Sequence, residues 1–172
     1  MTVNPTDVGL LVGRAAVGFV MLAHGYNHVF GGGKIAGTGR WFESLGMKPG
    51  WLHAWTASLT ELGVGVLLLL GLFTPLAGAG VVGVMLVAWV TNHRSNGFFI
   101  FRPGEGYEYV MTLTAVGLLF CGTGAGQISL DSALGIFDPP TSQEALACAA
   151  LGLLGAVGLL VGFWRPPAPT AK

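Results

Sequence analysis

The chain has 172 residues, of which 52% are hydrophobic and only 9% are charged, with eight basic and eight acidic side chains and no net charge. Soluble domains carry about 25% charged residues, so this composition excludes a soluble globular protein and intrinsic disorder alike. The balanced charge provides no field that would recruit nucleic acid, and we expect the lipid bilayer to be the main partner. The sequence therefore predicts an all-α fold, a polytopic membrane helical bundle.

Five apolar segments are candidates to cross the bilayer, which takes about 20 residues per helix. The first covers residues 8–30 and ends at a Gly-Gly-Gly triplet, and the second covers 53–72 after a polar loop. The third covers 75–92 and begins with a proline, which fits the first turn of a helix. The fourth, 107–121, is somewhat short, whereas the fifth, 145–164, has full length and contains no charge.

The basic residues predict how these segments are oriented. Seven of the eight lie in loops or at the C-terminus on one side of the membrane: Lys34, Arg40, Lys48, Arg94, Arg102, Arg165 and Lys172. The segments on the other side hold only acidic charges: Asp7, Asp131, Asp138 and Glu144. By the positive-inside rule, we expect a multi-pass protein of the plasma membrane with its N-terminus outside and its C-terminus in the cytoplasm.

Ionisable side chains inside a membrane span are costly and are therefore candidates for function. Arg14, His24 and His28 lie in the first segment, and Glu61 lies in the second. Because His24 and His28 are four residues apart, they share a helix face. The candidates for a catalytic role are Glu61 and His24. The candidates for ligand binding are Arg14, His24, His28, Glu61, His93, Tyr107 and Glu108.

Four interpretations compete for the inner half of the bundle, where we expect all four histidines to gather. A transition metal or a haem would use histidine ligands. The sequence contains no motif with the ligand spacing of a known metal or haem family, such as C-x-x-C-H, so we assign no metal site. A quinone pocket suits a buried carboxylate with nearby His and Tyr, which hydrogen-bond carbonyl groups and move protons. The commonest role of such groups is to satisfy one another between helices. The cofactor stays open, with a quinone favoured over haem or metal.

Two geometric expectations follow from the same residues. Arg14 should pair with Glu61, directly or through a water, or else Glu61 should pair with His24, because exposing a charge to lipid costs about 2.5–3.5 kcal/mol. A redox ligand would also require side chains from four helices to converge on one cavity. The expected converging residues and aromatic walls are His24, Glu61, His93, Tyr107 and Glu108 with Trp41, Phe42, Phe98, Phe99 and Phe101.

The two cysteines lie near the outer ends of the last two segments, Cys121 closing the fourth and Cys148 opening the fifth. A disulfide between such helix ends needs an oxidising compartment, whereas lone cysteines more often serve as small buried hydrophobes. The sequence leaves both outcomes open.

The order of several motifs resembles the DoxX family of small integral membrane proteins. The similar runs are GRAAVGFVMLAHGYNHVFGG, GTGRWFESLGMKP, LTELGVGVLLLLGLFTPLAG and GEGYEYVMTLTAVGLLFCGTGAGQISLD, which together span residues 9–131. The matching positions include Arg14, His24, Glu61 and Glu108. His28 departs from the family pattern, since members often carry a lysine there.

The resemblance implies a four-helix membrane core with an outer loop over residues 1–144. The segment 145–164 would then be an additional transmembrane helix, and 165–172 a disordered tail. Within the added helix, Gly158-x-x-x-Gly162 is a weak signal of contact with the fourth segment or another subunit, and we expect the core to fold without it.

Relatives in this family are subunits of a membrane thiosulfate:quinone oxidoreductase or are linked to redox and sulfur metabolism. The resemblance thus implies a redox-associated membrane subunit that contacts quinone or docks a soluble redox or sulfur-metabolism partner. The alternative is a non-catalytic scaffold that anchors soluble oxidative-stress or sulfur-handling enzymes in a larger complex. The sequence decides neither whether the chain is catalytic nor which protein partner or homo-oligomer it forms.

The predicted orientation can be tested with reporter fusions at Lys172 and Asp138. We expect a cytoplasm-active reporter at Lys172 and a periplasm-active reporter at Asp138, because basic loops are retained inside. Periplasmic activity at Lys172 would overturn the orientation.

Overall fold

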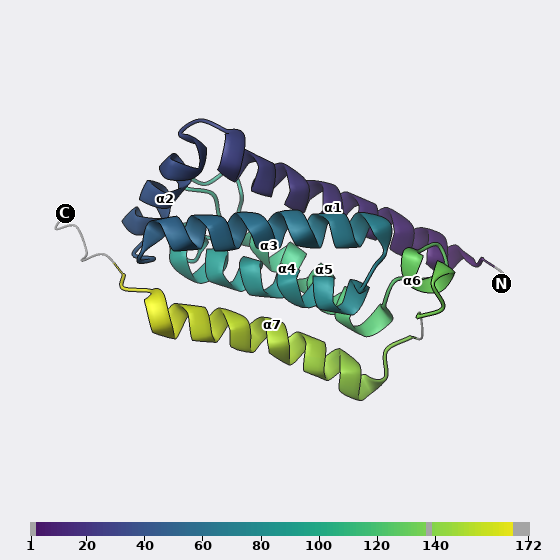
Figure 1. Ribbon diagram of the computed structural model, residues 1–172. Coiled ribbons are helices and arrows are strands. Elements are labelled where there is room, and N and C mark those ends of the chain that lie inside the picture. Colours follow the sequence, from purple (N-terminus) through teal and green to yellow (C-terminus); the bar gives the residue numbers. More distant parts are fainter. Residues whose placement is uncertain (1–2, 137–138, 167–172) are drawn as a thin grey trace.

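The computed structural model of the protein describes residues 3–136 and 139–166, and within these ranges it is helical, with no strand beyond one isolated bridge (Figure 1). The α4 helix continues directly into a short π-helical segment, η1. The bounds are α1 Pro5–Phe30, α2 Lys34–Ser44, α3 Gly50–Leu70, α4 Thr74–Ala88, η1 Trp89–His93, α5 Glu108–Thr123, α6 Leu130–Ala133 and α7 Ser142–Phe163. This architecture confirms the all-α membrane bundle.

Four helices are long and apolar enough to cross a membrane, namely α1, α3, α7 and α4 together with η1. The fifth expected span corresponds to α5, which is apolar but has only 16 residues. Each predicted segment is therefore a helix, and the protein is a multi-pass membrane protein whose apolar helix surfaces contact lipid.

Local sequence explains where the long helices start and stop. Asn4 caps α1 by accepting from the backbone N–H groups of Thr6 and Asp7, and the Asp7 carboxylate accepts from the N–H of Asn4 in return. Thr141 and Glu144 form the same reciprocal box at the start of α7, and both boxes satisfy amides that a helix start leaves unpaired. Gly71 ends α3 in the left-handed conformation, with φ of 64°.

The polar loop expected between the first two spans contains a helix, α2. Its apolar residues Ile35 and Phe42 recur at helical spacing and pack with Met47 in the turn after α2 and with Ala54 of α3. One apolar face is enough to hold a helix against a neighbouring one, so this segment is helical although its composition is polar.

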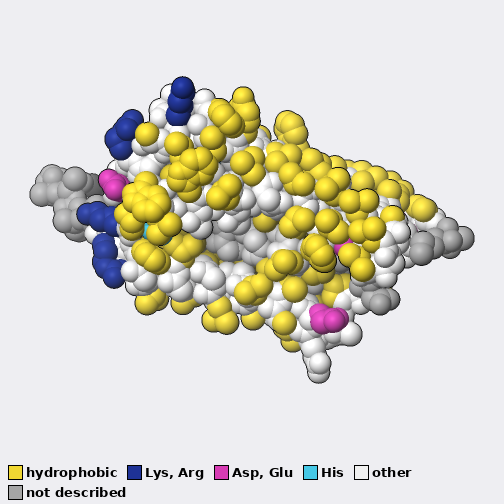
Figure 2. All heavy atoms as spheres, viewed as in Figure 1, with side chains coloured by type: hydrophobic (Ala, Val, Ile, Leu, Met, Phe, Trp, Pro, Cys, Tyr) yellow, Lys and Arg dark blue, Asp and Glu magenta, His cyan; other side chains and the backbone are white. Residues whose placement is uncertain are grey.

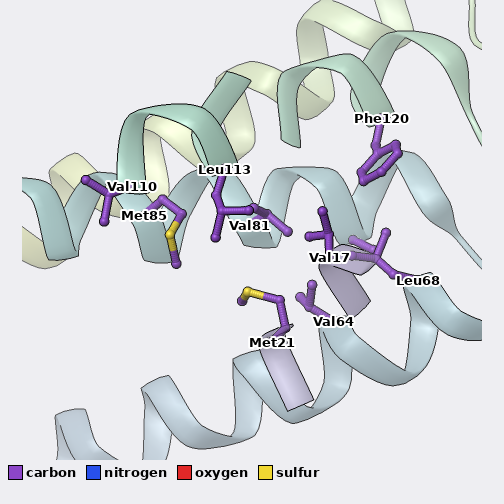
Figure 3. Packing of buried hydrophobic residues seen from close by; sticks show 10 residues of the cluster. Val17, Met21, Val64, Leu68, Val81, Met85, Val110, Leu113 and Phe120 are labelled. Atoms are coloured by element: carbon purple, nitrogen blue, oxygen red, sulfur yellow. The ribbon is translucent and has the colours of Figure 1, made fainter. Parts of the chain in front are cut away.

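Two close helix pairs form the core of the bundle. Gly18 of α1 faces Gly65 of α3, where a Cβ on either would lie 2.9 Å from the carbonyl oxygen of the other, and Gly78 of α4 faces Gly117 of α5 in the same way. Small residues allow such close backbone approach in membrane helices. Between the pairs lies the apolar cluster of Figure 3, which includes Val17, Met21, Val64, Leu68, Val81, Met85, Val110, Leu113 and Phe120.

The last helix, α7, packs against α4 and α5 on the side of the bundle away from α1 (Figure 1). The contact is made by Gly152, which is buried against Ala79 and Val82, whereas Gly158 and Gly162 face open space. The Gly158-x-x-x-Gly162 signal therefore does not mark the contact with the rest of the chain. The two cysteines are free thiols, Cys121 being buried.

The C-terminal end of α7 is fastened to the turn between α2 and α3. The Trp164 indole donates to the Leu45 carbonyl at 3.0 Å, and the Arg165 N–H donates to the Gly46 carbonyl at 2.8 Å. The Lys48 N–H donates in turn to the Phe163 carbonyl at 3.2 Å. These contacts close one end of the bundle.

Basic side chains gather at that same end, called the basic end below, as Figure 2 shows. It carries Lys34, Arg40, Lys48, Arg94, Arg102 and Arg165. The charge segregation expected from the sequence therefore has a spatial counterpart. Asp138, Lys172 and the rest of the tail, residues 167–172, lie outside the described residues.

Arg14 is buried near the opposite end of the bundle. Its two terminal nitrogens donate to the carbonyl of Leu68 at 2.9 Å and to that of Ile128 at 2.6 Å. Leu68 lies seven residues, roughly 10 Å, along α3 from Glu61. The direct Arg14–Glu61 pair that we expected is therefore wrong: the two terminal nitrogens of Arg14 donate to backbone carbonyls, and its Nε has no hydrogen-bond partner among the described residues.

Replacing Arg14 with Met should lower the free energy of unfolding in detergent by roughly 1–3 kcal/mol, because the Ile128 carbonyl loses the Arg14 donor and the Leu68 carbonyl keeps only the Gly71 N–H. Thermal unfolding measures the change. Arg40→Met is the matched control, since Arg40 is exposed on α2 and its removal should leave the melting temperature unchanged. Equal melting temperatures for both variants would contradict the assigned role.

Candidate functional site

A cavity of about 530 Å³ lies between the helix pairs and extends from the basic end along the bundle to Leu67 of α3 and Leu76 of α4. Its lining comes from α1, α2, α3, α4, η1, α5 and α7, and it includes all four histidines of the chain. This volume lies within the range of pockets that hold small organic ligands. The predicted gathering of the histidines around one space is confirmed.

The central polar feature of this cavity is a contact between α1 and α3. His28 Nδ1 lies 3.0 Å from Glu61 Oε2, and the Glu61 side chain is only 5% exposed. The close α1–α3 packing produces the contact, since Gly25 sits directly on Leu62, the neighbour of Glu61. Among the described residues this is the one ion pair, and it differs from the expected His24–Glu61 pair.

A second polar pair, His24 with Tyr109, joins α1 to α5. The Tyr109 hydroxyl lies 3.2 Å from His24 Nε2, and the two rings are stacked with centroids 5.9 Å apart. His24 is exposed, so this pair lies at a rim of the cavity. Two imidazoles on successive turns of α1 thus each meet a polar side chain of another helix.

The other two histidines have different surroundings. His93 Nδ1 donates to the Glu105 carbonyl at 3.0 Å, and its Nε2 lies 3.3 Å from the Asn92 amide nitrogen, so both ring nitrogens have partners. His53 is buried between the rings of Phe42 and Phe163. Its Nε2 has no hydrogen-bond partner in the part of the chain that the structure describes.

Not all the predicted site residues reach the cavity. His24, His28, Glu61 and His93 line it, whereas Arg14, Tyr107 and Glu108 do not. Trp41 and Phe42 form part of the wall as expected, while the rings of Phe98, Phe99 and Phe101 lie elsewhere. The convergence that we predicted is therefore correct for α1, α3 and η1 and wrong for the start of α5.

The prediction failed at α5 because the sequence alone does not show which face of this helix points to the cavity. Tyr109 faces the cavity, and each residue of a helix turns by about 100° from the one before. Tyr107 consequently packs against Trp89 and Phe98 instead. His53 was also left out of the predicted ligand set, because a histidine at a span end resembles an ordinary interfacial residue.

The cavity has a polar end and an apolar end. Its imidazole and carboxylate groups lie toward the basic end of α1 and α3. Away from these groups the wall is mostly aliphatic or glycine, as at Val64, Leu67, Gly80, Gly83 and Gly155, with the hydroxyl groups of Thr56 and Thr60 on α3. No group of three His, Cys, Asp or Glu side chains within residues 3–136 and 139–166 is arranged to hold a metal ion. The site can offer hydrogen bonds at one end and apolar cover at the other.

Removing residues 145–172 should leave an inserted four-helix core, because in lipid an exposed α4 face meets another apolar environment at little cost. The same deletion removes the α7 wall of the cavity. We therefore expect a monodisperse truncated protein in mild detergent that no longer retains a cavity ligand. Aggregation of the truncated chain would show that α7 is needed for the fold itself.

A comparison with family models finds a match to DoxX over residues 9–94, which is half of the chain. The match covers α1 to η1 and is shorter than the similarity noted in the sequence up to residue 131. No curated protein and no solved structure matches the chain.

Proposed function

The chain belongs to the DoxX family, and from this premise we propose that it is a redox-associated subunit of a membrane complex that binds a quinone in the cavity. The observation that carries the proposal is the buried His28–Glu61 contact in a wall that is otherwise largely apolar. A buried charged or proton-sharing pair is costly in a membrane and usually marks a functional site.

The donor set suits a ring with carbonyl oxygens. His28 and His53 approach the cavity from α1 and α3, and the unpartnered Nε2 of His53 is a buried polar atom that a ligand could satisfy. Such atoms are rare in folded proteins, where nearly all buried polar groups have partners. Phe42 and Trp41 supply flat apolar surface beside these nitrogens.

In this proposal the residues of the chain bind the ring, orient it and hold protons near it. The histidines hydrogen-bond the ligand oxygens, and Glu61 with His28 forms a site where a proton can reside. The exposed His24 and its partner Tyr109 lie between this site and the surface. Bound quinone supplies the redox chemistry, and a protein partner supplies or receives the electrons.

The distribution of charge supports a plasma-membrane orientation with the basic end in the cytoplasm. The cavity then opens its polar end toward the cytoplasmic leaflet, close to soluble partners. The enzyme activity would belong to the complex rather than to this chain alone.

One observation favours the second candidate function, a scaffold that anchors other proteins. The loop between η1 and α5 presents Phe98, Phe99, Ile100 and Phe101 at the basic end, and Phe101 is 77% exposed. Exposed aromatic residues beside arginines are typical of protein interfaces. A docking surface there is compatible with either function, so the cavity must be tested separately.

Glu61→Gln keeps the size and hydrogen bonding of the side chain but removes its titratable proton. We expect this variant to insert and melt like the wild type but to lose at least about tenfold of its bound quinone, the loss of one charged hydrogen-bonding partner being worth that much. Mass spectrometry of lipid extracts from the purified protein gives the quinone-to-protein ratio.

Glu108→Gln is the control, because Glu108 lies outside the cavity and its replacement should leave the ratio unchanged. Under the alternative, in which the pair only joins helices, Glu61→Gln would lose stability and nothing else. A Glu61→Gln protein that is stable and retains its quinone would end the case for Glu61, and the scaffold would become the leading function.

A further inference from the structure

The cavity has exposed lining residues on two sides. One set, His24, Trp41 and Glu105, is polar or aromatic and lies toward the basic end. The other set lies on α3, α4 and α7 and consists of Thr56, Leu76, Leu151 and Gly155. All four positions of the second set belong to helices long and apolar enough to span a membrane, so this side of the cavity faces lipid.

The opening on the lipid side exists because α3 and α7 do not pack along their length. Helix α4 contacts both of them and forms the floor between them, and Figure 2 shows the surface hollowed between α3 and α7. The floor is made of small residues, with Ala79, Gly80 and Gly83 lining the cavity. At the basic end the contacts of Trp164 and Arg165 join the end of α7 to the turn that precedes α3.

The α7 side of the opening has no polar side chain. Its lining residues are Leu151, Gly152, Gly155, Ala156 and Leu159. Along α3 the lining extends from His53 to Leu67, fourteen residues or roughly 21 Å. An elongated slot, apolar on its α7 side and with Thr56 and Thr60 on its α3 side, therefore leads from the hydrocarbon region to the histidines and Glu61.

From this geometry we infer that the ligand enters sideways from the bilayer between α3 and α7 and is an amphiphile with one long apolar chain. Its polar head lies against His28, His53 and Glu61, and its chain lies in the slot beside Gly155. This inference rests on the proposed function for the identity of the head group, but the sideways opening stands on the lining residues alone. A cavity of about 530 Å³ holds a ring and one chain rather than a two-chain lipid.

Gly155 offers a direct test because it lines the slot and has no atom within 4 Å of the position where a Cβ would be. Gly155→Trp should therefore fold normally and fill the slot. Gly158→Trp is the matched control, since Gly158 lies one turn further along α7, is equally open and does not line the cavity. Leu151→Trp, at an exposed slot position, is a second variant should Gly155→Trp melt early.

Two probes with the same head separate head binding from chain binding: a benzoquinone carrying a decyl chain and the same benzoquinone carrying a methyl group. Their dissociation constants are measured by equilibrium dialysis with the full chain in detergent. We expect Gly155→Trp to weaken binding of the decyl compound by about tenfold or more, since several buried methylenes lose their place. The methyl compound should bind as it does to the wild type, and Gly158→Trp should alter neither.

If the Gly155→Trp protein binds the decyl compound normally, or loses both compounds equally, the inference that the apolar chain lies in the slot is wrong. If neither compound binds the wild type, the head group of the ligand is not a quinone. A second measurement then tests whether the cavity opens sideways to the lipid. In vesicles, a long-chain alcohol with a diazirine in its chain should label the α4 residues around Gly80 and Gly83 in the wild type and far less in Gly155→Trp. Absence of that label in the wild type overturns the sideways opening.

Discussion

Inside a bilayer every buried polar group must find its partner within the protein, and this constraint organises both ends of the bundle. At the end opposite the basic residues the partners are backbone groups. Arg14 donates to two carbonyls, and Asp131 accepts from the amides of Phe73 and Thr74. These contacts tie α1 to the end of α3, the start of α4 and the segment that leads into α6, so they serve the fold.

At the basic end His93 also donates to a backbone carbonyl, that of Glu105, but Glu61 and His24 have side-chain partners. Glu61 meets His28, His24 meets Tyr109, and the Nε2 of His53 meets nothing in the described residues. A ligand can replace a side-chain partner without unwinding a helix, whereas freeing Arg14 would take a donor from the carbonyls of both Leu68 and Ile128. The kind of hydrogen-bond partner, rather than the number of ionisable groups, therefore distinguishes the candidate site from the structural contacts of Arg14.

The helices could be predicted from the sequence because apolar length and helix-breaking residues are local properties. The pairing of the ionisable residues could not, because it depends on how α1 and α3 are aligned, which the Gly18–Gly65 contact sets. Arg14 resembled a ligand-binding residue because the cost of burying a charge is the same for structural and functional roles. A two-residue difference, about 200° of rotation around the helix axis, likewise decided between Tyr107 and Tyr109.

The family match ends at residue 94 and so includes His28, His53 and Glu61 but neither Tyr109 nor any residue of α7. Under the proposed function, the groups that hold the polar head belong to the matched region, while the wall that admits the apolar chain comes from a later helix. The residues that bind the head group and the residues that admit the apolar chain then belong to different parts of the chain. A protein with the same His28–Glu61 contact but another last helix would keep the head group and bind a different chain, because only the wall beside Gly155 would change.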